Sequence, residues 1–256
     1  MSYSIDERNP ERQQLLAEIL NPLTRQVLAR LPEIPHARCL DLGCGQGNTT
    51  RCLAEVLRPT VCIGLEYDAG LVEYAKTRPE NPPSVRFQQG DATQLAFADA
   101  SFDLVFCRYL LIHMADPLRV IREMMRVVRP GGYAIAFEAD FAIEFSHPDC
   151  AALVSINKLW QGLFQNPAAG RKLVHYFREA GASDIQAGAV MHLEHDATTL
   201  KRTYRLTAEA TGAAAEAKGV LTADEVGEMI AGLTRMESDP SSVLVKFPDM
   251  WVIAKR

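Results

Sequence analysis

A glycine-rich loop between an apolar run and a helix constrains this 256-residue sequence most. Residues 37–42 form the apolar run, and Gly43, Gly45 and Gly47 follow it before a helical pattern begins at about Asn48. Glycine allows a sharp turn after a strand and lets a ligand approach the backbone without Cβ atoms in the way. The free N–H groups of the following helix point at whatever the loop holds. The segment LDLGCGQGNTT (40–50) therefore predicts a cofactor-binding loop.

Strand and helix patterns alternate through the first 140 residues. This alternation predicts an α/β protein with a parallel, doubly wound sheet that helices cover on both faces. The predicted strands are 37–42, 60–65, 85–88, 102–107 and 133–137. The predicted helices begin at about 48, span 71–76, and span 117–128 with Asp116 and Pro117 as N-cap and first helical residue.

Both ends of the chain carry helical patterns of their own. Helical spacing over 11–31 predicts two N-terminal helices divided at Pro22, because proline removes a helical hydrogen-bond donor. Beyond residue 140 we expect helices over 152–164, 171–180 and 198–219 and after a capping box at Thr222 and Glu225, with strands at 185–191 and 250–254. We expect one domain over 1–256: N-terminal cap helices (1–36), a cofactor-binding core (37–140), and substrate-covering helices with the last strands (141–256).

Charge and composition narrow the setting. The formal net charge is −5 and the basic residues are scattered, which argues against a nucleic-acid partner. The N-terminus has no apolar segment typical of a signal peptide, and no apolar stretch is long enough for membrane insertion. Cys39, Cys52, Cys62 and Cys107 lie in apolar runs, which favours packing in a reducing compartment over disulfides or zinc. We expect a cytoplasmic protein with a small-molecule partner, and a homodimer stays open.

The residues around the loop discriminate between cofactors. A dinucleotide loop has the spacing G-x-G-x-x-G, whereas here the third glycine comes one residue early and Asp41 precedes the first by two. A carboxylate there disfavours a pyrophosphate and favours an ammonium or a sulfonium. Glu66, 19 residues after Gly47, has the spacing of an acid that accepts hydrogen bonds from a ribose; an exposed strand-end carboxylate is the alternative. Asp91, placed to accept from an adenine amino group, is also typical of a turn.

Taken in order, residues Arg38–Phe137 resemble the class I (Rossmann-like) S-adenosylmethionine (SAM)-dependent methyltransferases. They look most similar to the small-molecule branch that includes ubiquinone and menaquinone methyltransferases. The resemblance is carried by LDLGCGQG, Glu66, GDATQLAF, FDLVFCRYLLIHMADP and RVVRPGGYAIAF. It implies a mostly parallel, seven-stranded Rossmann-like sheet with N-terminal helices, a helical insertion before the last strand, and that strand (MWVIA, 250–254) antiparallel.

The resemblance also implies SAM as the cofactor, with S-adenosylhomocysteine as the product, and it implies roles for individual residues. The methionine part of SAM would lie against Asp41, Gly43, Cys44, Gly45 and Gly47. The ribose would be held by Glu66, and the adenine by Tyr67, Asp91 and Ala92. Arg108 would line the lower wall of the cofactor site.

The acceptor is expected beyond the carboxyl ends of the fourth and fifth strands. His113 is the predicted proton acceptor, with local packing as the alternative. Glu138 and Asp140 leave the fifth strand and are predicted substrate contacts, although each also suits a polar loop. Trp160 and Tyr204 are predicted to cover the pocket, with ordinary core packing as the alternative. The segment Arg108–Leu111 lacks the N-P-P-[YF] signature of amide methyltransferases, which disfavours a planar amide acceptor.

These residues predict methyl transfer from SAM to an oxygen, nitrogen or carbon atom of a small apolar or aromatic molecule by in-line displacement. The alternatives are an enzyme of the same fold acting on a macromolecule, a SAM-binding protein without methyl transfer, and a nicotinamide-dependent dehydrogenase. The glycine spacing and Asp41 count against the last. His192 and His195 flank Glu194 on a predicted strand, where a surface or core role is favoured over a metal site.

Glu66→Ala should weaken SAM binding, because it removes one or two charged hydrogen bonds to the ribose, about 1.5–3 kcal/mol each. Titration calorimetry with SAM measures the loss. An unchanged affinity would refute the ribose assignment.

Overall fold

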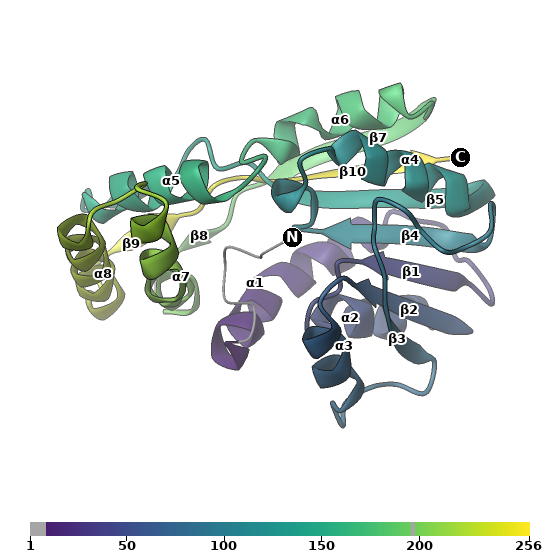
Figure 1. Cartoon of the computed structure of the whole chain (residues 1–256), viewed down its shortest axis with the longest axis horizontal. Helices are drawn as coiled ribbons and strands as arrows, with labels where there is room; N and C mark the ends of the chain where they lie inside the picture. The colour runs from purple at the N-terminus through teal and green to yellow at the C-terminus, as the bar shows by residue number, and fades with distance from the viewer. Residues whose placement is uncertain (1–8, 196–197) are drawn as a thin grey trace.

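The computed structural model describes residues 9–195 and 198–256; the first eight residues of the charged N-terminal segment lie outside the described residues. Its central sheet has seven strands in the order β3-β2-β1-β4-β5-β10-β7 (Figure 1). The strands are β1 (Arg38–Leu42), β2 (Val61–Glu66), β3 (Val85–Gln89), β4 (Phe102–Arg108), β5 (Val128–Ala139), β7 (Asp184–Val190) and β10 (Asp249–Lys255). β10 runs antiparallel to both β5 and β7, and the remaining neighbours are parallel. The predicted Rossmann-like sheet is confirmed.

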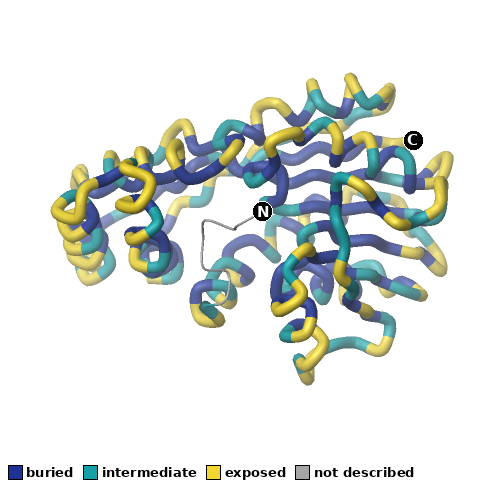
Figure 2. Tube along the Cα trace, in the orientation of Figure 1, coloured by how far each residue is buried: buried dark blue, intermediate teal, exposed yellow. Residues whose placement is uncertain are grey.

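The central strands are apolar without alternation because helices cover both of their faces. Figure 2 shows the strands in the middle of the sheet as its most buried part. Phe102 and Phe106 on β4 and Phe137 on β5 are almost completely buried. The four cysteines predicted to pack in the core are all buried, Cys39, Cys62 and Cys107 on the central strands and Cys52 on the helix that follows β1. Close packing of apolar side chains therefore stabilises the centre of the sheet.

Four helices lie against the sheet: α2 (Asn48–Leu57), α3 (Ala69–Lys76), α4 (Pro117–Val127) and α6 (Ala169–Glu179). Asp116 caps α4 by accepting a hydrogen bond from the Arg119 amide, and Pro117 is the first helical residue, as predicted. α4 and α6 pack against each other over β5. The chain crosses from β1 through α2 to β2 and from β4 through α4 to β5, which brings the carboxyl ends of β1 and β4 side by side.

The prediction of two N-terminal helices was wrong. One helix, α1, spans Pro10–Leu28 and contains Pro22 in its interior. Buried residues occur on both sides of the proline, with Ile19 and Leu20 before it and Val27 and Leu28 after it. An interior proline costs roughly 3 kcal/mol, and burial of four apolar side chains on one face outweighs that cost at about 1.5–3 kcal/mol each.

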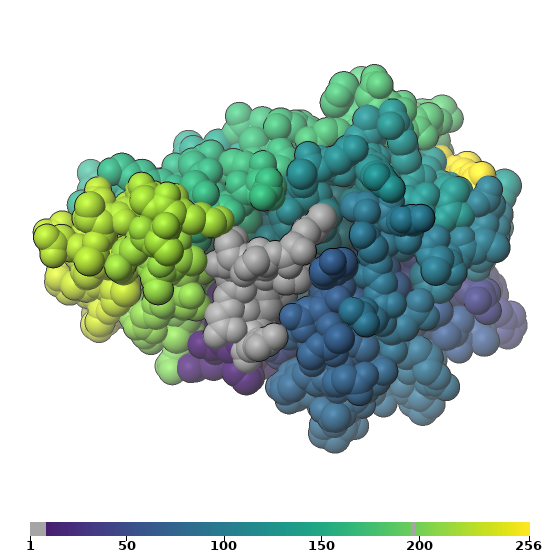
Figure 3. Space-filling view, in the orientation of Figure 1, coloured from purple at the N-terminus to yellow at the C-terminus, as the bar shows by residue number. Residues whose placement is uncertain are grey.

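Three helices from the segment between β5 and β10 form a lobe at one end of the molecule (Figure 3). It contains α5 (Ala152–Leu163), α7 (Thr199–Ala217) and α8 (Ala223–Ser238), and the predicted capping box of Thr222 and Glu225 begins α8. A second sheet, in the order β6-β9-β8, was not predicted. Its strands, β6 (Phe145–His147), β8 (Leu193–Glu194) and β9 (Val243–Val245), are too short to show a period of two. No helix within the described residues has the length and apolarity needed to cross a membrane.

Gly188→Ala should destabilise the protein by about 1–3 kcal/mol through overpacking. Gly188 on β7 lies opposite Trp251 on β10, and an added Cβ would come within 2.4 Å of the indole ring. Gly227 on α8 is the matched control, because nothing lies within 4 Å of its Cβ position. Gly227→Ala should instead stabilise the helix by up to about 1 kcal/mol. Chemical denaturation followed by circular dichroism compares the two, and equal stabilities would contradict the packing argument.

Candidate active site

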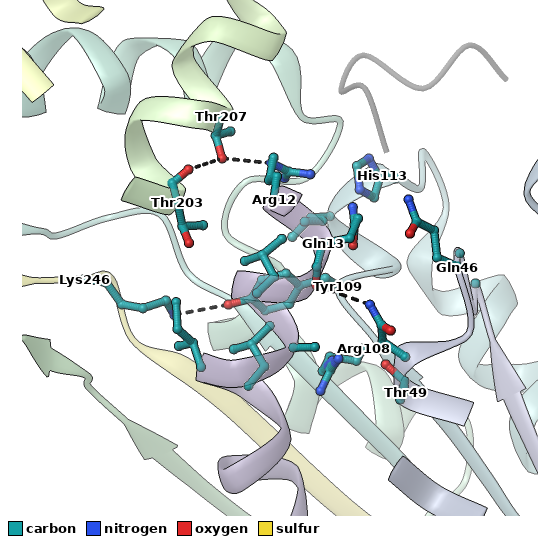
Figure 4. A pocket seen from close by; sticks show the side chains of 18 of the residues that line it. Arg12, Gln13, Gln46, Thr49, Arg108, Tyr109, His113, Thr203, Thr207 and Lys246 are labelled. Atoms are coloured by element: carbon teal, nitrogen blue, oxygen red, sulfur yellow. Dashed lines mark hydrogen bonds between the residues drawn. The ribbon is translucent and has the colours of Figure 1, made fainter. Parts of the chain in front are cut away.

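A cavity lined by seven of the fifteen predicted site residues lies beside the carboxyl ends of β1 and β4, where the strand order reverses. Ligands of open α/β sheets bind at this position. The glycine loop and Arg108 form one part of its wall, α1 and α7 form another, and aromatic side chains from α5 and from the segments after β5 and β9 close it. Figure 4 shows Tyr109 in the middle of this arrangement.

Backbone hydrogen bonds to the end of β2 hold the glycine loop in place. The Gly43 and Cys44 amides donate to Leu65 O at 2.8 and 3.1 Å, and the Gly45 amide donates to Glu66 Oε2 at 3.0 Å. Gly47 is the N-cap of α2, with φ of 84°, and no side chain caps that helix. A Cβ at Gly47 would meet the Phe87 ring at 2.5 Å. Glycine is therefore required there by conformation and by space.

Glu66 braces the loop. Its side chain is 2% exposed, and its Oε1 accepts from the Tyr67 and Asp68 amides at 2.7 and 3.0 Å. Glu66→Ala will therefore loosen the loop as well as remove the predicted ribose contacts. Glu66→Gln, measured beside Glu66→Ala, separates the two effects, because the glutamine side chain retains one acceptor oxygen.

A small depression adjoins the main cavity on the β2 and β3 side. It is lined by the predicted adenine residues Tyr67, Asp91 and Ala92 together with Leu110, and it shares Gly43 with the cavity. Tyr67 is 45% exposed, so its ring is accessible from solvent. The Asp91 carboxylate accepts hydrogen bonds from the amide and hydroxyl of Thr93, both at 2.7 Å, which orients it.

Asp41 lies beneath the loop and does not line the cavity. Its carboxylate accepts a hydrogen bond from Thr50 Oγ1 at 2.6 Å, which joins β1 to the first turn of α2. Burial raises its pKa to about 7, although Thr50 and the charge of Arg108 lower it. At neutral pH its negative charge is therefore partial, and it acts on a ligand through the loop.

Arg108, the residue predicted to line the cofactor site, lines the cavity. Its guanidinium donates to Asn21 Oδ1 at 3.0 Å and to Thr24 Oγ1 at 2.9 Å, both on α1. Burial lowers its pKa from the usual value. The side chain thus ties the end of β4 to the N-terminal helix while it faces the cavity.

His113 also lines the cavity, at the end of the short 3₁₀ helix Leu111–His113. Its ring contacts Phe164 edge to face with centroids 5.1 Å apart. Burial, and next to it the charge of Arg12, lowers its pKa to about 4. The imidazole is therefore neutral at physiological pH and is a weak base.

The four predicted substrate residues divide into two pairs. Trp160 and Tyr204 line the cavity, and Tyr204 donates its hydroxyl to Glu144 Oε2 at 2.8 Å. Glu138 and Asp140 do not line it. Glu138 accepts from the Leu110 and Leu111 amides at 2.9 and 2.7 Å, because the tight turn after β4 leaves these donors without helical partners. Burial raises its pKa to about 8.

Asp140 is 1% exposed and accepts two hydrogen bonds from Arg171, at 2.5 and 2.6 Å, which fasten the end of β5 to α6. Glu194, which lies between His192 and His195, accepts from the Leu200 amide at 2.5 Å and so satisfies the start of α7. Both carboxylates therefore have structural partners, and neither lines the cavity.

The sequence reasoning missed a buried polar network in the cavity wall. Tyr109 directly follows β4 with φ of 55°, and its hydroxyl donates a short hydrogen bond to Asp249 Oδ1. Lys246 Nζ donates to Asp249 Oδ2 at 2.6 Å and to Tyr109 Oη at 3.1 Å. Lys246 is 2% exposed and Asp249 is completely buried. The available signal was a lone lysine in the apolar run Val243–Phe247 with an aspartate three residues later.

Arg12 was missed as well, since it lies in the polar part of α1. It is 7% exposed, lines the cavity, and donates its Nε to Thr207 Oγ1 on α7 at 2.9 Å. The contact joins residues 195 positions apart in the sequence. Only the packing of α1 against α7 reveals it.

The sheet order, the braced glycine loop and the cavity at the strand ends define a class I, Rossmann-like methyltransferase fold. Residues 40–136 match a family model described as a methyltransferase domain. The chain is 35% identical over 136 residues to a 2-phytyl-1,4-naphtoquinone methyltransferase of Thermosynechococcus vestitus. That alignment covers 52% of this chain and 58% of the relative. It is 31% identical over 186 residues to an O-methyltransferase of Pyrenophora dematioidea. That alignment covers 71% of this chain and 66% of the relative.

Solved structures agree on the fold. The YcgJ protein of Bacillus subtilis superposes with a TM-score of 0.62 at 20% identity, over 93% of this chain and 99% of that one. The chain spans about half the length of several curated relatives that it matches. The chain belongs to the class I methyltransferase family.

Lys246→Met should destabilise the protein by about 3–5 kcal/mol, because it leaves the Asp249 carboxylate buried without its cation. Lys76→Met is the control: the pair of Lys76 with Glu73 is exposed, and such pairs contribute about 0–1 kcal/mol. Adding Asp249→Asn to Lys246→Met should recover part of the loss. Urea denaturation at neutral pH measures all three, and equal effects of the two lysine variants would show that the buried pair is unimportant.

Proposed function

We propose that this protein binds SAM across the glycine loop and transfers its methyl group to a small apolar or aromatic molecule held in the cavity. One observation carries the proposal. The depression lined by Tyr67, Asp91 and Ala92 and the cavity lined by the aromatic side chains meet at Gly43. A ligand with a purine at one end and a reactive group at the other can therefore lie across the loop with that group facing an apolar chamber.

The residues present fit this cofactor. Gly43, Cys44 and Gly45 line the cavity, and the left-handed conformations of Gly43, Gly45 and Gly47 give the loop its tight turn. No side chain caps the N–H groups at the start of α2, and the partly charged Asp41 lies beneath the loop, which together suit an amino-acid group with charges of both signs. In this proposal Gly43, Cys44, Gly45 and Arg108 hold the methionine part, Glu66 holds the ribose, and Tyr67, Asp91 and Ala92 hold the adenine.

The names of the relatives support a small-molecule acceptor, since they include a naphtoquinone methyltransferase and an O-methyltransferase. The aromatic wall supports an apolar or aromatic one. Phe141 stacks on Phe164 with centroids 4.8 Å apart and on Trp160 at 5.3 Å, and Phe247 meets Phe141 edge to face. Flat rings of this kind bind a flat acceptor through burial and offset stacking.

The chemistry asks little of the protein beyond alignment. When bound, SAM would supply a methyl group on a sulfonium, and loss of that methyl group leaves a neutral thioether. The aromatic wall excludes water and orients the acceptor atom, which contributes to the rate by proximity. For a hydroxyl acceptor, His113 in its neutral form accepts a hydrogen bond from the hydroxyl and fixes its direction. Because its pKa is about 4, the imidazole positions the acceptor and is a weak proton acceptor.

Incubation with SAM and a panel of hydroxylated aromatic and prenylated molecules tests the function through the formation of S-adenosylhomocysteine. His113→Ala should lower kcat about 2–10-fold, the value of one neutral hydrogen bond, and His113→Asn should retain most of the rate. The profile of kcat/KM against pH should show no ionisation between about pH 5 and 8 from this residue. Methylation of a peptide or tRNA without turnover of the panel would contradict the proposal. A limb near pH 6.5 that disappears in both variants would show that His113 is the general base.

A further inference from the structure

The buried network of Tyr109, Lys246 and Asp249 has no task in the proposed methyl transfer. Tyr109 and Lys246 line the cavity, whereas Asp249 is completely buried and does not line it. Distant parts of the chain build the network, since Tyr109 follows β4, Lys246 follows β9 and Asp249 begins β10. A few fixed polar groups in an otherwise apolar cavity commonly orient a ligand. The network is therefore a candidate for contact with the acceptor.

The hydrogen bonds of the network determine what it offers to a ligand. The Tyr109 hydroxyl donates its single proton to Asp249 Oδ1 and accepts from Lys246 Nζ at 3.1 Å. Lys246 Nζ also donates to Asp249 Oδ2 at 2.6 Å and to Phe247 O at 3.3 Å, so its three protons all have partners. The Tyr109 oxygen retains one lone pair. The network therefore offers a hydrogen-bond acceptor to the cavity and no donor.

The proton of the Tyr109 hydroxyl is committed to Asp249. Burial, together with the Asp249 carboxylate, raises the pKa of Tyr109 well above its usual value, so the phenol is protonated at neutral pH. If the hydroxyl turned toward a ligand, the buried carboxylate would lose one of its donors, which is unfavourable away from water. The polarity of this point in the wall is therefore fixed by the fold.

The hydroxyl groups that α7 contributes to the cavity have the same polarity. Thr203, Tyr204 and Thr207 line the cavity. Thr203 Oγ1 donates to Thr199 O and Thr207 Oγ1 donates to Thr203 O, both at 2.7 Å, as hydroxyls within a helix commonly do. Tyr204 Oη donates to Glu144 Oε2 at 2.8 Å. The protons of these three hydroxyl groups are therefore also committed to partners within the protein.

Tyr109 and His113 contact different parts of a bound acceptor. Figure 4 shows the Tyr109 hydroxyl pointing toward Lys246, whereas His113 lies on the side of the cavity near Gln46. In the proposed function the reacting hydroxyl of the acceptor donates to His113. A hydroxyl group has one proton, so a hydrogen bond to the Tyr109 oxygen requires a second donor on the same molecule.

We propose that the methyl acceptor is an aromatic molecule with a second polar substituent, a hydroxyl or an amine, which donates a hydrogen bond to Tyr109 Oη. The inference rests on the proposed methyl transfer and specifies its acceptor. The flat body of the molecule packs against Phe141, Trp160 and Phe164. An ether or a carbonyl in place of the second substituent would bring its lone pairs against the lone pair of Tyr109, which disfavours such a ligand.

Matched ligands test this polarity. Dihydroxynaphthalenes are titrated into the protein beside analogues in which one hydroxyl is replaced by fluorine or by a methyl ether, with and without saturating S-adenosylhomocysteine. At least one diol should bind at least fivefold more tightly than both of its analogues, about the value of one hydrogen bond. Tyr109→Phe, which removes the oxygen and keeps the ring, should reduce this preference to less than twofold. Tyr74→Phe is the control and should leave the preference unchanged, because the Tyr74 hydroxyl accepts from Arg78 and Tyr74 does not line the cavity.

A second variant tests whether Asp249 commits the proton of Tyr109. Lys246→Met combined with Asp249→Leu replaces the buried pair by apolar side chains, a change that proteins often tolerate. The Tyr109 hydroxyl then lacks both partners and is free to donate, so a diol and its methyl ether should bind within twofold of each other. A diol preference that persists in this variant would show that the ion pair does not set the polarity. Urea denaturation checks that the variant folds, and if it does not, Tyr109→Phe decides.

Other outcomes overturn the inference. If no diol is preferred, or if the preference survives in Tyr109→Phe, the Tyr109 oxygen does not bind a donor of the acceptor. If Tyr109→Phe weakens S-adenosylhomocysteine tenfold while the diols bind as before, Tyr109 belongs to the cofactor site. The titrations without S-adenosylhomocysteine keep the two proposals separate. A diol preference in a protein that does not bind this ligand would count against methyl transfer and leave the Tyr109 contact standing.

Discussion

The hydrogen bonds that tie the glycine loop to the end of β2 are the constraint on which the site depends. Gly43, Cys44 and Gly45 direct three consecutive amides to Leu65 O and to the Glu66 carboxylate. Since the same carboxylate accepts from the first two residues after β2, it fixes two strand exits at once. A loop of left-handed glycines would otherwise have many conformations. The hydrogen bonds to the end of β2 restrict the glycine loop to one conformation. The loop can then form part of the wall of both the depression and the cavity.

A second constraint comes from charge buried around that floor. Asp41 and Glu138 have pKa values raised by burial to about 7 and about 8, so neither places a full negative charge beneath the cavity at neutral pH. Their hydrogen bonds to Thr50 and to the turn after β4 keep the loop and the turn in place. The cations, in contrast, face the cavity itself. Carboxylates therefore support the wall from behind, and hydrogen bonds satisfy the polar groups that are buried there.

The sequence predicted the parts of the molecule that local patterns encode. The sheet, the glycine loop, the cap of α4 and the capping box of α8 each depend on residues a few positions apart, and each was found. Pro22 was misread because its local cost is offset by burial along the rest of α1, which no local rule contains. Glu138 and Asp140 looked like substrate contacts because they leave a central strand, yet their partners are the turn after β4 and Arg171. The contact of Tyr109 with Asp249 spans 140 residues, and no short pattern encodes such a pair.

The residues that short sequence patterns predict and the residues that only the fold brings together lie in different parts of the site. The match to the methyltransferase domain covers residues 40–136, which contain the glycine loop, Glu66, Asp91 and Arg108. Arg12, Trp160, Tyr204 and Lys246, which complete the cavity, all lie outside that range. The family match therefore bears on the cofactor side and does not cover the residues that complete the cavity. The acceptor must be inferred from the shape and chemistry of the wall that α1, α5, α7 and the segment after β9 build around it, where Phe141 stacks on Trp160 and Phe164.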